Sequence, residues 1–391
     1  MYCISKKPIR AILAFIAIFF GLSRVANAQI FTRLAYSPGN TSSGYSILNL
    51  KDNSIYFTAE YNSNFIKIFS AEANTEIFDQ RLSPNGKYIA VIARDLERKY
   101  PFVDVLEEYR NTTFIHGKDV LILDTKGEVL IKLEPDYLLG LDWNPEGDKL
   151  ICVTGDYEKN PVKSEWLPGD ALSIYDVASK EKISSHVAPQ NEYYWNVAWA
   201  EHDGNIYIEL SVKKEYGFYS GIFRYDYKTS ELVPTPLNAL NISPDGKYCF
   251  HDIVNHVKNG HIGLYSTSTG NETRFIVPDR ILTWNNVSDQ VNYRIFTHQL
   301  KHLSWIIEGG KTYAVLYNLA PSAFLAKMGI SGFWKVDCET GVFEELAAPK
   351  GISTYYKSRN DYQMPAGLEN GKLIWAVPND SGGLKASALD Q

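Results

Sequence analysis

Short runs in which apolar and polar residues alternate recur along the chain, and most of them follow a turn that contains a glycine. Alternation with a period of two is typical of β-strands, because successive side chains point to opposite faces of a sheet. The clearest turns have the pattern Pro-x-Gly and lie at Pro84–Gly86, Pro145–Gly147 and Pro244–Gly246. Weaker copies of the same turn contain Gly204, Gly310 and Gly371.

The spacing of this repeat predicts a β-propeller. Gly204 and Gly246 lie 42 positions apart, which is the length of one four-stranded propeller blade. The other intervals are longer, and loops inserted into the same unit explain them. A second hairpin follows the turns, as in Asp119–Leu130 and Leu172–Val177, and supplies the third and fourth strands of each blade.

We expect an all-β fold with seven blades; six and eight blades are the alternatives. A shortened first blade is predicted from Asn49–Phe57 and Ile66–Phe69. The last blade runs out of chain near Gln391, so the N-terminal segment Ile30–Tyr36 is expected to supply its missing strand and close the ring. Closure of the ring removes the free strand edges that promote aggregation.

The first residues have the pattern of a secretory signal peptide. A basic stretch, Lys6–Arg10, precedes the apolar run Ala11–Leu22, and Ala26–Ala28 has the small residues of a cleavage site. We therefore expect residues 1–28 to be a signal peptide cleaved after Ala28, and residues 29–391 to form one propeller domain. An uncleaved anchor is the alternative. No second long apolar stretch follows, so a secreted or periplasmic protein without a membrane span after cleavage is predicted.

Composition excludes one class of partner. The net charge of -6 argues against binding to nucleic acid, because such proteins carry a basic patch or stripe. Apart from Cys3 the chain has three cysteines, an odd number that excludes a full disulfide framework. Cys152 and Cys249 lie at equivalent interior positions of the repeat and are expected to be small buried apolar residues. No motif for a cofactor or a metal site is found, and none is expected.

The phrase Ser243–Tyr248, followed about twenty residues later by Leu264–Gly270, resembles the WD40-like (PD40) repeats of TolB-type β-propellers. Similar repeats form the propellers of prolyl-oligopeptidase-type peptidases. The resemblance covers most of residues 29–391, and its motifs describe blade geometry without any catalytic residue. The N-terminal domain of TolB and a peptidase domain have no counterpart in this sequence. The nucleophile motif Gly-x-Ser-x-Gly is also absent, so serine peptidase activity is not expected.

Long insertions are expected on one face of the propeller. The Pro-x-Gly turns join the first and second strands of each blade on one face, and the longest predicted loops belong to the other. A rigid scaffold with one elaborated face is typical of a binding protein, and sequence drift in a tolerant scaffold is the alternative. The predicted insertions are Asp95–Lys118, Gly155–Gly169, His251–His261, Pro278–His302 and Asn318–Ser331.

Three groups of candidate ligand-binding residues lie in or beside these insertions. Converging carboxylates nine positions after the turn glycines could hold a cation or a basic ligand, and simple polarity at strand ends is the alternative. Aromatic residues expected in the connections between blades, at the mouth of the central channel, could bind sugars or peptide side chains, and packing between blades is the alternative. Histidines beside an aspartate could bind a metal, although a solvated loop is favoured. The acidic group is Asp95, Asp156 and Asp380, with Asn255; the aromatic group is Tyr137, Tyr194, Trp195 and Trp284; the histidine group is His251 and Asp252, with His256 and His261.

The favoured function is that of a non-enzymatic scaffold that binds a protein or a peptide on the loop-rich face. A small molecule or a glycan is a further possible ligand. The alternative is an enzyme that acts on a carbohydrate or a lactone, with Asp95, Asp156 or His251 as acid, base or metal ligand, because propellers host such chemistry at similar positions. A quinone-dependent dehydrogenase is disfavoured, because the repeated tryptophans that dock one blade on the next in such propellers are not found.

Overall fold

The computed structural model describes most of the predicted repeat. The described residues are 34–36, 44–49, 52–60, 63–95, 118–155, 169–214, 217–250, 255–256, 261–276, 299–318, 332–346, 368–369, 372–378 and 384–388. The predicted signal peptide lies outside them. Among the described residues, no helix is long and apolar enough to cross a membrane.

Antiparallel hairpins join consecutive strands into the first four sheets. The first contains β1 (Leu34–Tyr36), β2 (Tyr45–Asn49), β3 (Ser54–Thr58) and β4 (Ile66–Ser70). The second contains β5 (Thr75–Leu82), β6 (Tyr88–Asp95), β7 (Lys118–Asp124) and β8 (Val129–Leu133). The third contains β9 (Tyr137–Trp143), β10 (Lys149–Gly155), β11 (Ala171–Asp176) and β12 (Glu181–Val187). The fourth contains β13 (Glu192–Trp199), β14 (Ile206–Lys214), β15 (Gly217–Asp226) and β16 (Glu231–Pro234).

The remaining three sheets follow the same plan with two departures. The fifth contains β17 (Asn241–Ile242), β18 (Tyr248–Phe250), β20 (His261–Ser266) and β21 (Glu272–Ile276). The sixth contains β22 (Gln299–Glu308), β23 (Lys311–Asn318), β24 (Gly332–Asp337) and β25 (Phe343–Leu346), and it gains β19 (Asn255–His256) as a fifth strand. The seventh has three described strands, β26 (Leu368–Glu369), β27 (Lys372–Pro378) and β28 (Leu384–Ala388).

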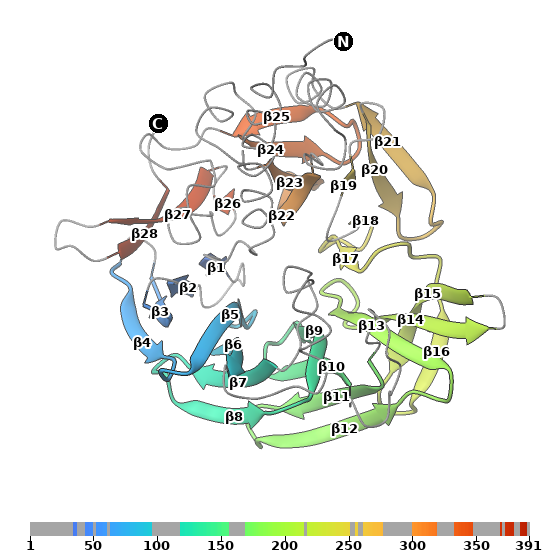
Figure 1. Cartoon of the computed structure of the whole chain (residues 1–391). Coiled ribbons are helices and arrows are strands. Elements are labelled where there is room, and N and C mark those ends of the chain that lie inside the picture. Colours follow the sequence, from blue (N-terminus) through green and yellow to red (C-terminus); the bar gives the residue numbers. More distant parts are fainter. Residues whose placement is uncertain are drawn as a thin grey trace, which may run out of the picture.

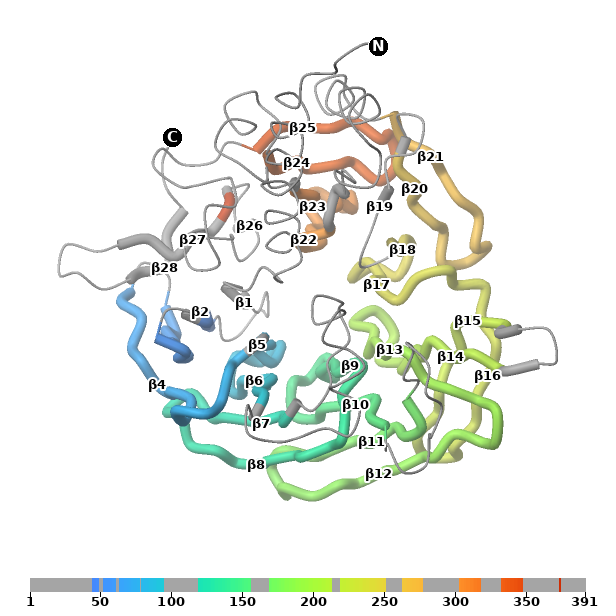
Figure 2. Tube along the Cα trace, in the orientation of Figure 1, coloured from blue at the N-terminus to red at the C-terminus, as the bar shows by residue number. Residues whose placement is uncertain are grey.

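The sheets stand around a ring, and the first strand of each complete sheet lies nearest the centre (Figure 1). The chain follows the ring in sequence order, as the colours of the trace show (Figure 2). This arrangement confirms the predicted all-β propeller. Six sheets have four or five strands, and the seventh has three among the described residues.

The predicted closure by the N-terminal segment is wrong for the residues that the structure describes. β1 pairs with β2 in the first sheet, with Leu34 opposite Ile47, and it is not part of the sheet that contains β27 and β28. The first blade is also longer than the predicted segments Asn49–Phe57 and Ile66–Phe69, because it begins with β1 and the turn between Asn49 and Ser54 joins its second and third strands. Pairing with a strand that follows at once closes a short loop and costs less entropy than pairing the two ends of the chain.

The core lies between the sheets. The second strand of each blade is covered by neighbours on both sides, so its side chains alternate between two apolar clusters. In β10, Leu150 and Cys152 pack towards the second sheet, and Ile151 and Val153 pack towards the fourth. All three cysteines described are buried and free, which fits the apolar role predicted for Cys152 and Cys249.

The Pro-x-Gly turns follow a fixed hydrogen-bond pattern. In the second sheet the amide of Ser83 donates to the carbonyl of Tyr88 at 2.8 Å, and the amide of Gly86 donates to the carbonyl of Ser83 at 2.8 Å. Gly86 has a φ of 69°, a left-handed conformation that favours glycine. The Ser83 hydroxyl accepts from the amide of Tyr88 at 2.9 Å and completes the turn. Ser243, Gly246 and Tyr248 repeat this pattern in the fifth sheet.

Candidate functional site

The two faces of the propeller differ in the length of their connections. Because the strands of a sheet alternate in direction, the first and third connections of each blade emerge on one face, and the others emerge on the opposite face. We call these the turn face and the loop-rich face. From the second sheet to the sixth, no connection on the turn face exceeds six residues. The long connections of the loop-rich face are residues 96–117, 156–170, 251–260, 277–298, 319–331 and 347–367.

Two of these connections pair with the inner strand of the next blade. Gly169, in the connection between β10 and β11, exchanges both backbone hydrogen bonds with Tyr194 of β13, at 2.8 and 2.9 Å. β19, in the connection between β18 and β20, pairs with the first residues of β22, His256 opposite Gln299. Segments of the loop-rich face are therefore fixed beside the inner strands, which surround the centre of the ring (Figure 1).

At the second sheet, the side chain of Asn53 pairs with the inner strand of the next blade. Asn53, in the turn between β2 and β3, accepts a hydrogen bond from the amide of Ile77 at 2.8 Å, and its Nδ2 donates to the carbonyl of Thr75. The amide group thus satisfies the edge of β5 in the way that a neighbouring strand would. Asn53 has a φ of 51°, a conformation that asparagine tolerates better than most residues.

Nearer the turn face, polar side chains link the inner strands of successive blades. Arg81 of β5 donates from Nη1 to the carbonyl of Leu141 in β9 at 2.8 Å, and the indole of Trp143 donates to the carbonyl of Arg81 at 3.0 Å. Asp142 of β9 accepts from the amide of Trp199 in β13 at 2.8 Å. Backbone groups on the free edges of these strands therefore find partners in the next blade.

Asp142 is the titratable group with the most unusual environment in this network. Protein atoms surround its carboxylate although part of the residue remains accessible, and this desolvation raises its pKa to about 6. The positive charge of Arg81 and hydrogen bonds from the amides of Trp199 and Trp143 act in the opposite direction. The carboxylate can therefore change its charge near neutral pH while it joins the third blade to the fourth.

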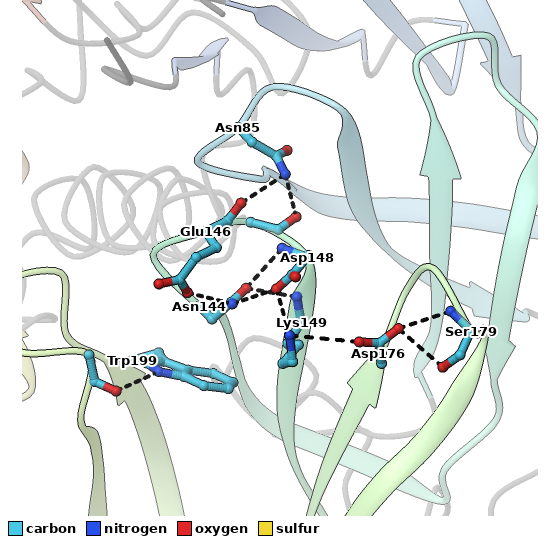
Figure 3. A network of polar contacts seen from close by, with 10 residues as sticks. Asn85, Asn144, Glu146, Asp148, Lys149, Asp176, Ser179 and Trp199 are labelled. Atoms are coloured by element: carbon cyan, nitrogen blue, oxygen red, sulfur yellow. Dashed lines mark hydrogen bonds and ion pairs between the residues drawn. The ribbon is translucent and has the colours of Figure 1, made fainter. Parts of the chain in front are cut away.

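On the turn face, polar side chains bind one another and the backbone (Figure 3). Asn85 donates from Nδ2 to the carbonyls of Glu146 and Gly147, at 2.9 and 3.0 Å, and links the turns of two blades. Within the second of these turns, Asn144 binds Glu146 and Asp148 at 2.8 and 2.7 Å. These contacts satisfy the groups within the protein and leave them less available to a ligand.

The expectation that the aromatic residues lie in connections between blades is wrong for three of them, because Tyr137 begins β9 and Tyr194 and Trp195 lie within β13. Their environments differ. Tyr137 and Tyr194 are 1% and 0% exposed, so their rings pack inside the protein and offer no open face to a ligand in this arrangement. The Tyr194 hydroxyl lies 2.7 Å from Nδ1 of His186 on the preceding blade. Trp195 is partly exposed, and its indole donates to the hydroxyl of Ser211 at 2.6 Å. A ligand-binding role for these residues stays a prediction, and Trp195 is the best placed of the three.

The acidic and histidine groups are less fully described. Asp95 is the last residue of β6, at the loop-rich face as predicted, and its backbone pairs with Thr75. His256 belongs to β19 and His261 begins β20. Among the described residues, no group of three or more His, Cys, Asp or Glu side chains could hold a metal ion. Asp156, Asp380, Trp284, His251 and Asp252 lie outside the described residues.

Sequence reasoning missed the polar links between the inner strands. Arg81 and Asp142 occupy the same position of the repeat, two residues before the Ser or Asn that opens the turn, and Asn241 occupies it in the fifth sheet. Asn241 also binds across blades, because it accepts from the indole of Trp305 at 2.8 Å. A polar residue recurring two positions before the first residue of the turn was the signal that could have identified this position.

Comparisons with known proteins do not identify a family for this chain. No protein-family model matches the chain, and no curated protein matches it. Among solved structures, the β-propeller domain of the Trilobed protease from Pyrococcus furiosus is 17% identical over 91% of this chain and 92% of that chain, with a TM-score of 0.45. Acylaminoacyl peptidase from Pyrococcus horikoshii is 14% identical over 93% of this chain and 52% of that chain, with a TM-score of 0.44.

A chain of the mitotic checkpoint complex is 12% identical over 92% of this chain and 91% of that chain, with a TM-score of 0.48. With identities of 12 to 17% and TM-scores of 0.48 or less, these likenesses carry no argument about this chain. The assignment to TolB-type repeats stays a prediction.

Proposed function

We propose that this propeller is a secreted or periplasmic scaffold of the TolB type that binds a protein or a peptide over the loop-rich face. The observation that carries the proposal is the placement of the long connections. Six of them leave from one face, whereas the opposite face of the second to sixth sheets has short turns. Long connections on a rigid scaffold are where binding residues concentrate, because they vary without disturbing the core.

The anchoring of two connections supports the same proposal. The pairing of Gly169 with Tyr194 and of β19 with β22 holds segments of these connections beside the inner strands. A binding surface that is partly fixed before the partner arrives loses less conformational entropy on association than a fully mobile one. The net charge of -6 favours a partner that is neutral or basic.

Shortening one connection tests the proposal. Arg94 and Lys118 are paired across β6 and β7, so replacing residues 96–117 with Asn-Gly leaves a three-residue hairpin loop that begins with Asp95. The matched control is Gly309→Asn, which places the same Asn-Gly pair in the tight turn between β22 and β23 on the turn face. Gly309 and Gly310 have φ values of 58° and 76°, which suit an Asn-Gly turn.

The readout is the set of proteins that each variant captures from the extracellular or periplasmic fraction of its host, followed by measured affinity for the purified partner. We expect the shortened variant to lose its partner and Gly309→Asn to keep it, with equal unfolding transitions for both. Equal affinity of the two variants for every captured partner would remove connection 96–117 from the binding surface. If shortening each of the other long connections also left affinity unchanged, the proposal would fail.

A further inference from the structure

A cavity of about 320 Å³ opens on the turn face between the fourth and the fifth sheets, opposite the proposed binding face. Its walls come from four places in the fold. The turn after β13 contributes His202, the end of β15 contributes Arg224, and the turn after β20 contributes Thr267 and Ser268. The fourth wall is the end of β16 with the connection from β16 to β17. Because both strands are short, this connection lies close to the turn face, where the carbonyl of Pro236 is beside Gly270.

One wall of the cavity is rigid. The imidazole of His202 lies over Gly246, where a Cβ atom would come within 2.3 Å of the ring, and it stacks on Tyr207 with an interplanar angle of 14°. Asp203 accepts from the Tyr207 hydroxyl at 2.7 Å and lies 3.1 Å from Nε2 of His202. These contacts fix the ring before any ligand binds, and a preformed wall reduces the entropy cost of binding.

Arg224 supplies the positive charge of the cavity. Its side chain is exposed and forms no ion pair within the described part of the chain, and its charge acts on Tyr207, which lies opposite it on the neighbouring strand. The carboxylates nearby have other partners: Asp203 binds Tyr207, Asp226 accepts from the amide of Lys228 at 2.8 Å, and Asp245 accepts from Thr312 at 2.5 Å. A guanidinium group without a partner binds a carboxylate through two parallel hydrogen bonds.

The remaining wall is largely apolar and poor in free donors. Pro234, Pro236 and Leu237 contribute apolar surface, and the prolines have no amide hydrogen. The hydroxyl of Thr235 donates to the carbonyl of Ile222 at 2.7 Å, and that of Thr267 donates to the carbonyl of Gly246. The Thr235 oxygen also accepts from the amide of Leu237 at 3.3 Å, which leaves it one lone pair, and the Thr267 oxygen can also accept from a ligand. The cavity thus offers one cation, acceptors and an apolar surface.

We propose that this cavity binds the C-terminal end of a peptide whose last side chain is apolar, with the terminal carboxylate on Arg224. The peptide amide would donate to the threonine hydroxyls, and the apolar side chain would pack on Pro236 and Leu237. The volume is at the lower end of the range for small-ligand pockets, and it matches one or two residues. A single guanidinium fits a monoanion better than a phosphate dianion, which usually meets several donors and cations.

Calorimetric titration of the purified protein tests the assignment with two probes, acetyl-Gly-Ala-Leu with a free carboxylate and the same peptide with a C-terminal amide. The free acid is expected to bind about tenfold more tightly than the amide, because only the acid forms a charge-assisted pair with Arg224. Arg224→Gln should abolish this difference. Lys228→Gln removes a charge from the same sheet outside the cavity and should preserve it.

Ser268→Phe provides a second variant, because it fills the mouth of the cavity without a change of charge; it should weaken binding of both probes. Equal affinity for the acid and the amide, a preference that survives in Arg224→Gln, or no binding of either probe at millimolar concentration would overturn the proposal. Binding of octanoate in an Arg224-dependent manner without binding of the peptide would overturn it in favour of a fatty carboxylate. The variant shortened at residues 96–117 should bind the acid normally, so this outcome is independent of the proposed function.

Discussion

The buried link between the third and the fourth blades predicts a particular dependence of stability on pH. Asp142 has a pKa raised to about 6 in the folded protein, chiefly by desolvation, against 3.8 for an ordinary aspartate. The folded state therefore binds a proton more tightly than the unfolded state does. The stability that this group contributes is fully present below pH 3.8 and is lost as the pH rises through 6.

The magnitude follows from the two pKa values. Between pH 4.5 and pH 7 the group should change the free energy of unfolding by about 2 kcal/mol, with the larger stability at pH 4.5. This is an upper value, because the accessible part of Asp142 lets solvent screen the charge. Asp142→Asn removes the titration and keeps a carbonyl oxygen that can accept from the amide of Trp199.

Wild type and Asp142→Asn are unfolded with urea at half-unit pH steps. The difference between their free energies of unfolding at each pH measures the contribution of the Asp142 titration. Titrating groups that do not interact with Asp142 cancel in this difference, which should shift by about 2 kcal/mol in favour of the wild type as the pH falls from 7 to 4.5. Glu201 is the exception, because its charge also raises the pKa of Asp142. Asp226→Asn is the control, and its difference should stay nearly constant over this range. Hydrogen bonds, first that from the amide of Lys228, lower the pKa of Asp226 from 3.8, so its contribution is lost only as the pH falls below the range measured. A difference for Asp142→Asn that does not change with pH would refute the reasoning.

Two further predictions follow from burial and backbone geometry. Gly246→Ala should lower the free energy of unfolding by more than Gly204→Ala. Both positions have positive φ, but only at Gly246 would a Cβ atom come within 2.3 Å of His202. We expect losses of about 1 kcal/mol for Gly204→Ala and about 3 kcal/mol for Gly246→Ala, measured by urea unfolding. The thiols should resist iodoacetamide at pH 8 in the folded protein and react after unfolding, as mass spectrometry can follow, because desolvation raises their pKa. The thiols in question are Cys152, Cys249 and Cys338.

The repeat made the architecture predictable because its information is local. An alternating run specifies a strand with two apolar faces, and a glycine with positive φ specifies where the chain turns back. Ile151 and Val153 on one face of β10, and Cys152 on the other, show how a continuous apolar run becomes the contact surface of two blades. The expectation that β1 would complete the last sheet failed because pairing between distant segments is not encoded in such local patterns.

The candidate aromatic site was less predictable because a β-bulge changes the direction of side chains. The pairing of β13 with β14 shifts between Tyr194 and Asn196, so Trp195 is an extra residue without an opposite partner. Tyr194 is consequently buried between blades, whereas Trp195 is partly exposed. Regular alternation from Trp199 and Val197 would place residue 195 on the buried face, and the bulge places Tyr194 there instead. Sequence alternation alone contains no sign of the bulge.

Departures from the repeat are where this scaffold gains room for a ligand. Where the turn motif is kept, the turns of successive blades bind directly, as Asn85 binds the carbonyl of Gly147 at 3.0 Å. The fourth blade lacks the proline of the motif and places His202 against Gly246 instead, and the cavity beside Arg224 lies at this junction. In a regular repeat the polar groups of the turns form hydrogen bonds with the next blade. An irregular copy leaves some hydrogen-bond donors without such partners and leaves space between the blades. The same logic explains why the loop-rich face, where the connections differ most between blades, is the better candidate for partner binding.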